Sequence, residues 1–413
     1  MNCSGGKTAS IFLNARSPDA DLYLMPTPLQ FFAPCPRGLE HTFVDELIEL
    51  GIDSPAAVPG GVAFAAPLDA VYRVNYWSRI ASRILLRVAD GEYRNEEDIY
   101  QLARQVRWED WFKPVQTLRV DLVATKSPLT SLKFTTLRVK DAICDRLREL
   151  TGIRPSIDKL LPDVRVHVYL DAARVMLYLD TSGEALFKRG YRSEKVEAPL
   201  RENLAAGILR LAGWTPDQPL YDPMCGSGTF LIEGARMALG LPPAVKRRYG
   251  FERLHFFDAK AWDAVRGAAT KALVAAPQIF ASDISAQTLR IAVGNFNAAG
   301  VGSVIRARTG DLLKLDAPCA QPGVMVANPP YGERIGTAEE LDLFYPELGH
   351  TLKKTYAGWN CFFLSADRKM EKLIRLKASR RTPLMNGDLD CRLYEFKMVA
   401  GGNRERSGPA GQP

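Results

Sequence analysis

Residues 221–230, YDPMCGSGTF, decide the fold that the sequence predicts. They follow a short apolar run that ends at Leu220 and precede an apolar-periodic stretch over residues 231–239. The pattern predicts a strand, a glycine turn and a helix, with Gly226 and Gly228 letting the backbone pass close to a ligand. The helix would direct free N–H groups and its positive dipole end toward the turn.

The residues around this turn limit which classes of ligand it could bind. Asp222 at the predicted strand end suits a cationic or hydrogen-bond-donating ligand better than a phosphate. A phosphate-binding loop needs a Lys after its glycines, and none stands there. A dinucleotide fold needs a third small residue where this chain has Leu231. A tight turn that binds nothing is the alternative.

A second stretch makes a ligand site the better interpretation. The apolar strand 324–327 runs into Asn328-Pro329-Pro330-Tyr331. Two successive prolines end the strand and fix an extended turn. The Asn amide offers a donor and acceptors at the strand end, where open α/β sheets bind ligands. The Tyr ring offers a face for a base to stack on. An ordinary strand-ending turn is the alternative.

Together these two motifs resemble the class I S-adenosylmethionine-dependent methyltransferases that act on exocyclic amines of nucleic-acid bases. D-P-x-C-G-S-G-T-F is similar to their motif I, and N-P-P-Y is similar to their catalytic motif. The resemblance implies S-adenosyl-L-methionine as cofactor and no metal. It implies catalytic roles for Asn328, Pro329, Pro330 and Tyr331, and cofactor contacts from Asp222, Pro223, Gly226, Ser227, Gly228 and Thr229.

Acidic residues end two further predicted strands. Residues 278–284 form an apolar strand that ends at Asp283 and Ile284, and a carboxylate there suits the ribose diol of a nucleoside. Asp311 ends a shorter strand and is placed to accept a hydrogen bond from an adenine amine. For either Asp alone, a helix N-cap is the competing interpretation.

The chain carries a second resemblance before these motifs. F-x-x-C-P-R-G-L-E, V-K-D-A-I-C-D, R-V-H-V-Y-L, L-D-T-S-G-E-A-L and K-R-G-Y-R are similar to the THUMP-containing large-subunit ribosomal RNA guanine-N2-methyltransferases, over about Phe31 to Val399. The resemblance implies an α/β protein in which a Rossmann-like methyltransferase domain follows an α+β ferredoxin-like and THUMP RNA-binding region. It also implies that Glu202 and Asn203 close over the cofactor.

We therefore expect five segments. They are a disordered arm (1–28), a ferredoxin-like segment (29–90), a THUMP domain (91–190), a methyltransferase domain (195–400) and a disordered tail (401–413). Within them, a clear antiparallel pair is predicted over 165–170 and 174–179, and a closing hairpin over 380–396. Some family members carry a second methyltransferase domain after this point, and we expect that activity to be absent.

The charge is unevenly distributed. The chain has a net charge of +7, and residues 101–200 hold 18 Lys and Arg against 13 Asp and Glu. This excess indicates a polyanion partner, although a solvated basic surface is the simpler alternative. With the THUMP resemblance it favours ribosomal RNA, bound by Lys140, Arg146, Arg165, Lys188, Arg189 and Arg192.

Other features exclude several classes of protein. The seven cysteines show no C-x-x-C spacing and the chain has only four histidines, so neither a zinc site nor a disulfide framework is expected. We interpret Cys225 as a packing residue and His167 as structural. No apolar run is long enough to cross a membrane and no secretory signal is evident, which predicts a cytoplasmic protein.

The function that the sequence predicts is transfer of a methyl group to the N2 amine of a guanine in 23S rRNA or a precursor particle. Three alternatives stay open. The same chemistry could act on tRNA, and N-P-P-Y also serves adenine-N6 methylation of DNA. The third is an RNA-binding ribosome assembly factor with an inactive fold, which the intact Asp222, Asp283, Asp311 and Asn328 argue against.

Overall fold

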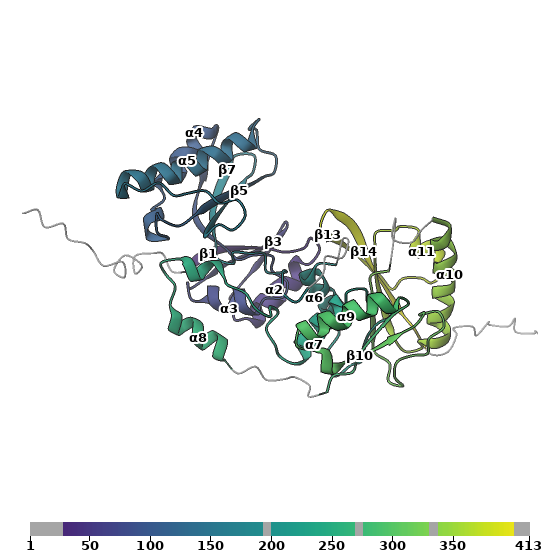
Figure 1. The fold of residues 1–413 in the computed structure, drawn as a ribbon. Helices are drawn as coiled ribbons and strands as arrows, with labels where there is room; N and C mark the ends of the chain where they lie inside the picture. The colour runs from purple at the N-terminus through teal and green to yellow at the C-terminus, as the bar shows by residue number, and fades with distance from the viewer. Residues whose placement is uncertain (1–27, 193–199, 269–275, 330–337, 400–413) are drawn as a thin grey trace, which may run out of the picture.

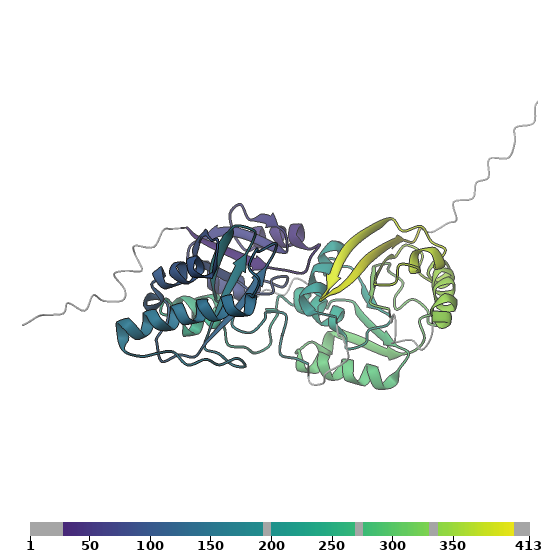
Figure 2. The ribbon, with the colours of Figure 1, turned by 90° about the horizontal axis from the view of Figure 1, so that it is seen from above.

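The computed structural model describes residues 28–192, 200–268, 276–329 and 338–399, and the expected arm and tail lie almost wholly outside them. Two mixed sheets of seven strands each organise the chain into an N-terminal and a C-terminal body (Figures 1 and 2). Among the described residues, no helix is long and apolar enough to cross a membrane.

The N-terminal sheet has the strand order β2-β3-β1-β4-β7-β6-β5. Its central pairing joins β4 to β7 over the length of both strands, so the expected ferredoxin-like segment and THUMP domain share one sheet. The sequence predicted two separate units and did not predict this pairing. The strands are β1 (Leu29–Pro34), β2 (Ala56–Val58), β3 (Gly61–Ala66), β4 (Leu85–Glu92), β5 (Leu118–Ala124), β6 (Val164–Leu170) and β7 (Arg174–Asp180).

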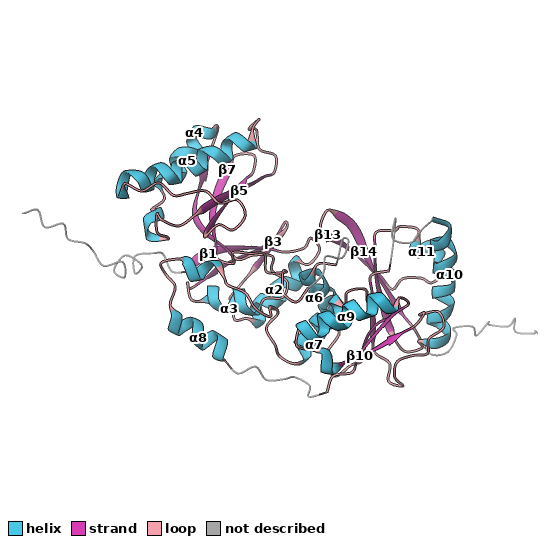
Figure 3. Ribbon diagram, in the orientation of Figure 1, coloured by secondary structure: helices cyan, strands magenta, loops and turns pink. Residues whose placement is uncertain are grey.

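One face of this sheet forms the core of the N-terminal body. Phe31 pairs with Leu86, and Leu86 pairs with Leu179, so these apolar side chains lie in register across β1, β4 and β7. They join one buried cluster with Phe43 and Ile143 from the covering helices. Figure 3 shows those helices beside the strands: α2 (Glu40–Glu49), α3 (Ala70–Trp77), α4 (Glu96–Gln105) and α5 (Leu132–Thr151).

The ends of these helices follow the local sequence. Asn95 and Asp98 form a capping box at the start of α4, which satisfies backbone donors that the helix itself leaves free. Ser131 caps α5, and Gly152 ends it in the left-handed conformation that glycine adopts without steric cost. The helix expected to continue toward Ala81 stops at Trp77 instead.

The C-terminal sheet has the order β10-β9-β8-β11-β12-β14-β13. Its first five strands are parallel and the last two form an antiparallel hairpin, as the sequence predicted. The strands are β8 (Leu220–Asp222), β9 (Ile279–Asp283), β10 (Ile305–Thr309), β11 (Val324–Ala327), β12 (Asn360–Ser365), β13 (Arg380–Asn386) and β14 (Leu389–Lys397). The helices are α6 (Glu202–Leu211), α7 (Thr229–Ala238), α9 (Ala286–Ala298), α10 (Ala338–Thr355) and α11 (Met370–Leu373).

One segment of the expected methyltransferase domain belongs to the N-terminal core instead. The short helix η2 (Gly250–Arg253) and α8 (Ala259–Gly267) lie beside α3 (Figure 1). The Tyr72 ring lies 4.9 Å from the Phe251 ring and 6.2 Å from that of Trp262, and its hydroxyl donates to the Phe256 carbonyl at 3.1 Å. The boundary at residue 195 therefore does not separate two independent cores.

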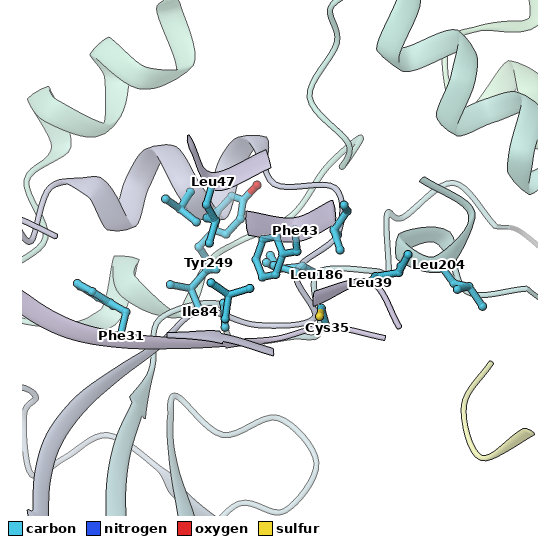
Figure 4. Close-up of a cluster of buried hydrophobic side chains, with 14 of the residues drawn as sticks. Phe31, Cys35, Leu39, Phe43, Leu47, Ile84, Leu186, Leu204 and Tyr249 are labelled. Carbon is cyan, nitrogen blue, oxygen red and sulfur yellow. The ribbon is translucent and has the colours of Figure 1, made fainter. Parts of the chain in front are cut away.

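The two bodies also meet through a close apolar contact. Figure 4 shows Leu39 and Leu204 within one cluster of buried side chains that runs from Phe31 to α6. A Cβ added to Gly207 would lie 2.3 Å from Leu39 Cδ1, so only glycine allows α6 to approach this closely. The cluster fixes α6, and with it the start of the C-terminal body, against the N-terminal sheet.

Candidate active site

The predicted site residues gather at one edge of the C-terminal sheet. Asp222 and Asp283 end the neighbouring parallel strands β8 and β9, and Thr309 of β10 pairs with Asp283. On the other side of β8, Asn328 follows β11. The carboxyl ends of parallel strands face the same way, so three strands deliver polar side chains to the position where open α/β sheets bind ligands.

The two glycines of the turn between β8 and α7 have different surroundings. Gly228 has φ +80°, and a Cβ there would lie 2.2 Å from Phe296 Cε1, so this glycine allows α7 to pack on α9. Gly226 has φ +54° and no described atom within 4 Å of an added Cβ. One glycine thus serves packing, and the other leaves open space beside the turn.

Asp283 holds this turn in place. One of its carboxylate oxygens accepts the Gly226 N–H at 3.0 Å and the other accepts the Ser285 N–H at 3.0 Å. The N-cap of α9 is Ser285, whose hydroxyl accepts from Thr288, so the N-cap alternative for Asp283 is wrong. Each carboxylate oxygen keeps further acceptor capacity, which a ribose diol would use.

Asp222 is a buried carboxylate whose charge is stabilised by few hydrogen bonds. Its side chain accepts one hydrogen bond, from the Met224 N–H at 3.1 Å, and only 2% of the residue is exposed. Burial raises its pKa well above the usual range, and the nearby Asp283 charge adds to this, while the Met224 bond opposes it. A cation or a good hydrogen-bond donor at this point would offset the cost of burying the charge.

The remaining strand-end residues lie beside this pair. Gly310 donates to the Asp283 carbonyl at 3.0 Å, which holds the loop after β10 against β9. In that loop, Asp311 accepts from Leu313 at 3.0 Å and lies 3.6 Å from the Lys314 ammonium. Ile284 is 72% exposed, so its side chain is available to cover a ligand.

Asn328, like Asn203 and Asn295, has a side-chain oxygen that lacks a partner within the described part of the chain. Its side-chain oxygen is buried and accepts no hydrogen bond from the described residues. A buried polar atom without a partner costs free energy of about 1–3 kcal/mol, which a ligand donor would recover. Pro329 is also buried, whereas Pro330 and Tyr331 lie outside the described residues.

Glu202, which was expected to close over the cofactor, is linked to the glycine turn through Arg192. Glu202 forms an ion pair with Arg192 at 2.7 Å, and Arg192 also donates to Thr229 at 3.0 Å, which joins α6 to the glycine turn. The Ser227 hydroxyl lies 3.2 Å from that of Thr229. Burial raises the pKa of Glu202, and Arg192 opposes the shift.

Asn203 contacts the N-terminal body through its side-chain amide. Its amide nitrogen donates to the Ile80 carbonyl at 3.2 Å and to the Ser82 hydroxyl at 3.1 Å, both in the N-terminal body. Its amide nitrogen is therefore used in the contact between the two bodies, while its buried side-chain oxygen has no partner among the described residues. That Asn203 closes over the cofactor stays a prediction.

The prediction that Arg189 binds RNA is wrong. Arg189 is only 1% exposed, and its guanidinium pairs with buried Glu233 of α7 at 3.1 Å. The same guanidinium donates to the Arg79 carbonyl at 2.6 Å. Burial alone would lower the Arg189 pKa, but Glu233 raises it. This residue joins the two bodies and cannot reach a nucleic acid.

The other expected RNA contacts differ in availability. Arg192 lies beside the glycine turn, paired with Glu202. Arg146 is held by Glu109, with Nε to Oε2 at 2.8 Å, and Lys140 by Asp141 at 2.8 Å. Lys188 keeps 60% of its side chain exposed, and Arg165 lies 3.8 Å from Asp121. Lys140, Arg146, Arg165 and Lys188 remain predictions.

Sequence reasoning missed Asn295 as a support of the site. This buried residue of α9 donates from its amide to the Ser227 carbonyl at 3.0 Å. The available signal was a polar residue at the spacing of the apolar face that Leu289 and Ala292 define.

His167 contacts Asp180 at 3.2 Å, and Cys225 is buried with its pKa raised by desolvation, in keeping with structural roles for both. Among the described residues, no group of acidic, His and Cys side chains could hold a metal.

Five parallel strands, a closing antiparallel hairpin and acidic strand ends around a glycine turn define the class of Rossmann-like methyltransferases. The chain belongs to the RMKL-like methyltransferase family, whose domain profile matches residues 189–395. A THUMP domain profile matches residues 93–180, and the profile of the RlmL ferredoxin-like domain matches residues 30–85.

Individual relatives agree with this assignment. The chain is 38% identical to a ribosomal RNA large subunit methyltransferase K/L of Photobacterium profundum, over 92% of this chain and 54% of that protein. A putative RNA methyltransferase of Synechocystis is 35% identical over 90% of this chain and 97% of its own length. The chain thus spans about half the length of the K/L methyltransferases it matches. A putative methyltransferase crystallised with SAH superimposes with a TM-score of 0.82 at 29% identity, covering 92% of this chain and all of that one.

Proposed function

We propose that the chain is an S-adenosylmethionine-dependent rRNA methyltransferase that modifies the exocyclic N2 amine of a guanine in 23S rRNA, the position-2445 type of activity. The observation that carries this proposal is the buried side-chain oxygen of Asn328, which has no partner among the described residues and lies beside the acidic ends of β8 and β9. The names of the K/L relatives and the SAH complex of a structural neighbour support it.

The cofactor site would be formed by the glycine turn and three carboxylates. Asp283 would accept from the ribose diol and Asp311 from the adenine amine, with Ile284 covering the base. The open space beside Gly226 and the uncompensated charge of Asp222 fit a cationic nucleoside ligand. When bound, this cofactor supplies an electrophilic methyl group on a positive sulfonium.

Asn328 and Pro329 would act on the incoming guanine. Its amine is a weak nucleophile because the lone pair is conjugated with the ring. Two acceptors, the Asn328 oxygen and the Pro329 carbonyl, would bind the two amine hydrogens and favour the pyramidal nitrogen of the transition state. The amine nitrogen would take the methyl group, the electron pair of the broken carbon–sulfur bond would stay on sulfur, and the amine proton would leave to solvent.

The base must leave its helix to reach this edge of the sheet. In the proposal Tyr331 stacks on the extruded base, and the THUMP region binds the surrounding RNA. The substrate would be 23S rRNA or a precursor particle, which places the reaction in the cytoplasm. The alternatives are the same chemistry on tRNA, adenine-N6 methylation of DNA and a non-catalytic assembly role.

The test compares nucleic acids directly. Purified protein is incubated with labelled cofactor and, separately, 23S rRNA, tRNA or duplex DNA, and the modified nucleoside is identified by mass spectrometry. We expect N2-methylguanosine in 23S rRNA alone. N6-methyladenine in DNA, or label in tRNA alone, would replace the proposal, and no label in the presence of RNA binding would favour the assembly factor.

A further inference from the structure

The N-terminal sheet carries an aromatic surface on the face that its helices leave uncovered. Side chains alternate along β1, so Phe31 enters the core while Phe32 lies on the opposite face. On that same face β7 contributes Tyr178 and Met176, and Met176 pairs with Tyr169 of β6. These residues come from three strands, β1, β6 and β7, which only the shared sheet brings together.

These side chains line a hollow of about 300 Å³. The rings of Phe32 and Tyr178 lie 6.1 Å apart at 45°, and Tyr169 and Met176 form the wall toward β6. Pro59, in the turn between β2 and β3, lines the hollow at the opposite edge of the sheet. Phe32, Tyr169 and Met176 are only partly buried, so part of each side chain remains accessible from outside.

The charge beside this hollow is positive. Arg87 pairs with Tyr178 across β4 and β7 and lines the hollow, with 34% of its side chain exposed. Among the described residues, its ionic contact is a long one, 3.8 Å to Asp90. Further along the same face, Arg119 of β5 and Arg165 of β6 share the carboxylate of Asp121, at 2.6 Å and 3.8 Å. Arg87 is therefore the basic residue that lines the hollow.

Aromatic rings on an open sheet beside the Arg87 guanidinium suit a nucleotide. Single-stranded RNA binds proteins by stacking unpaired bases on aromatic side chains, while Arg and Lys follow the backbone. A purely apolar ligand would use the rings but would make no use of the Arg87 guanidinium. The observed combination therefore favours RNA over a peptide or a lipid.

We propose that this hollow binds one unstacked base of RNA, with Tyr169 and Phe32 contacting the base and Arg87 the adjoining phosphate. The proposal rests on the proposed function, because that function makes RNA the partner. The bound base is distinct from the methylated guanine, which belongs to the strand ends of the other sheet. The hollow would hold a flanking single-stranded segment while the target guanine enters the active site.

The experiment uses the full chain and a fluorescein-labelled uridine dodecamer, since stacking sites tolerate any base. Tyr169→Ala should weaken binding roughly 5- to 150-fold, the effect of losing one stacking contact, and Tyr169→Phe should bind nearly as the parent does. Tyr100→Ala, a partly buried tyrosine of α4 on the helix side, is the matched control and should leave RNA affinity unchanged. Binding of SAH by each variant serves as the check on folding.

A second measurement locates the base directly. RNA containing 4-thiouridine is irradiated with the parent protein, and crosslinked peptides are identified by mass spectrometry. Crosslinks to Phe32, Tyr169 or Tyr178 would support the hollow even if no guanine were methylated, in which case only the proposed function would fail. Normal methyl transfer with unchanged Tyr169→Ala affinity, or with crosslinks confined to other surfaces, would overturn the hollow alone.

Discussion

The carboxylate of Asp283 accepts a hydrogen bond from the backbone N–H of Gly226 at 3.0 Å. The end of β9 is thereby joined to the turn that follows β8, 57 residues earlier in the chain. Asp283 has two tasks in our proposal, since it shapes the glycine turn and accepts from the cofactor ribose.

Asp283→Ala should therefore weaken cofactor binding by at least the worth of one charge-assisted hydrogen bond, about 1.5–3 kcal/mol. Calorimetric titration with SAH measures this. Asp316→Ala, an exposed carboxylate near the same sheet edge, should bind SAH as the parent does. Unchanged affinity in a folded Asp283→Ala variant would show that the ribose is not bound here.

The two glycines of the turn should respond differently to alanine. Gly228→Ala places a methyl group 2.2 Å from Phe296 at a positive φ, so we expect a loss of stability in thermal unfolding. Gly226→Ala meets open space, so its cost should be limited to the strain of the left-handed backbone, about 1–2 kcal/mol. Its main effect should be weaker SAH binding, and equal SAH affinities for the parent and Gly226→Ala would contradict a ligand beside that glycine.

The buried Asp222 predicts a pH-dependent stability. Its folded-state pKa is raised by burial and by Asp283, so the folded protein holds this proton to higher pH than the unfolded chain does. The contribution of Asp222 to stability must then fall as pH rises from the usual Asp range toward the raised value. Asp222→Asn should raise the Tm at pH 7, and the gain should shrink as the pH approaches 4.

The same variant should bind SAM less tightly, because the neutral amide loses its attraction for a cationic ligand. Unfolding scans across pH, with and without SAM, separate the two effects. A Tm gain that did not depend on pH would mean that ionisation of Asp222 is not its source, and no gain at pH 7 would mean that the charge is compensated in the free protein.

Asn328 should matter mainly in the transition state. Asn328→Ala should lower kcat by about 10²–10³, the scale for losing one preorganised partner, with little change in RNA affinity. Asn328→Asp keeps a side-chain acceptor and should retain more activity. Single-turnover methyl transfer to rRNA, with RNA binding measured separately, tests both. Full activity in Asn328→Ala would mean that N-P-P-Y is only a strand-ending turn here.

Arg189 should matter for stability and not for direct RNA contact. Removing one partner of a buried ion pair costs about 3–5 kcal/mol, so Arg189→Ala should strongly destabilise the fold. Lys188→Ala removes a neighbouring exposed pair and should change stability by less than about 0.5 kcal/mol. Denaturant unfolding compares the two. Normal stability with lost RNA affinity in Arg189→Ala would restore the original prediction of an RNA contact.

The sequence predicted the local elements better than their partners. Apolar periodicity and the glycine turn located β8, α7 and the closing hairpin, because those signals depend on neighbouring residues. Periodicity shows that one face of a strand is buried, but it does not show against which element. The pairing of β4 with β7 and the packing of Trp262 on Tyr72 join distant parts of the chain, so neither was predicted.

For the site as well, the sequence predicted the positions of residues better than their contacts. Asp222, Asp283 and Asn328 were predicted because strand ends in parallel sheets meet at one edge, a general rule of topology. Arg189 was misassigned because K-R-G-Y-R looks like a basic surface until its buried partner Glu233 is known. The contacts of Asn203 were not predicted, because its position at the start of α6 does not reveal which body its amide nitrogen faces.

The packing of η2 and α8 on α3 has a consequence for synthesis of the chain. Tyr72 emerges from the ribosome long before Phe251 and Trp262, which cover it in the native protein. Domains generally fold as units during translation, and contacts this distant in sequence form slowly. The nascent N-terminal body keeps an aromatic surface exposed until residue 262 has left the ribosome. At that point most of the C-terminal sheet is still untranslated. That interval is where a chaperone would be needed.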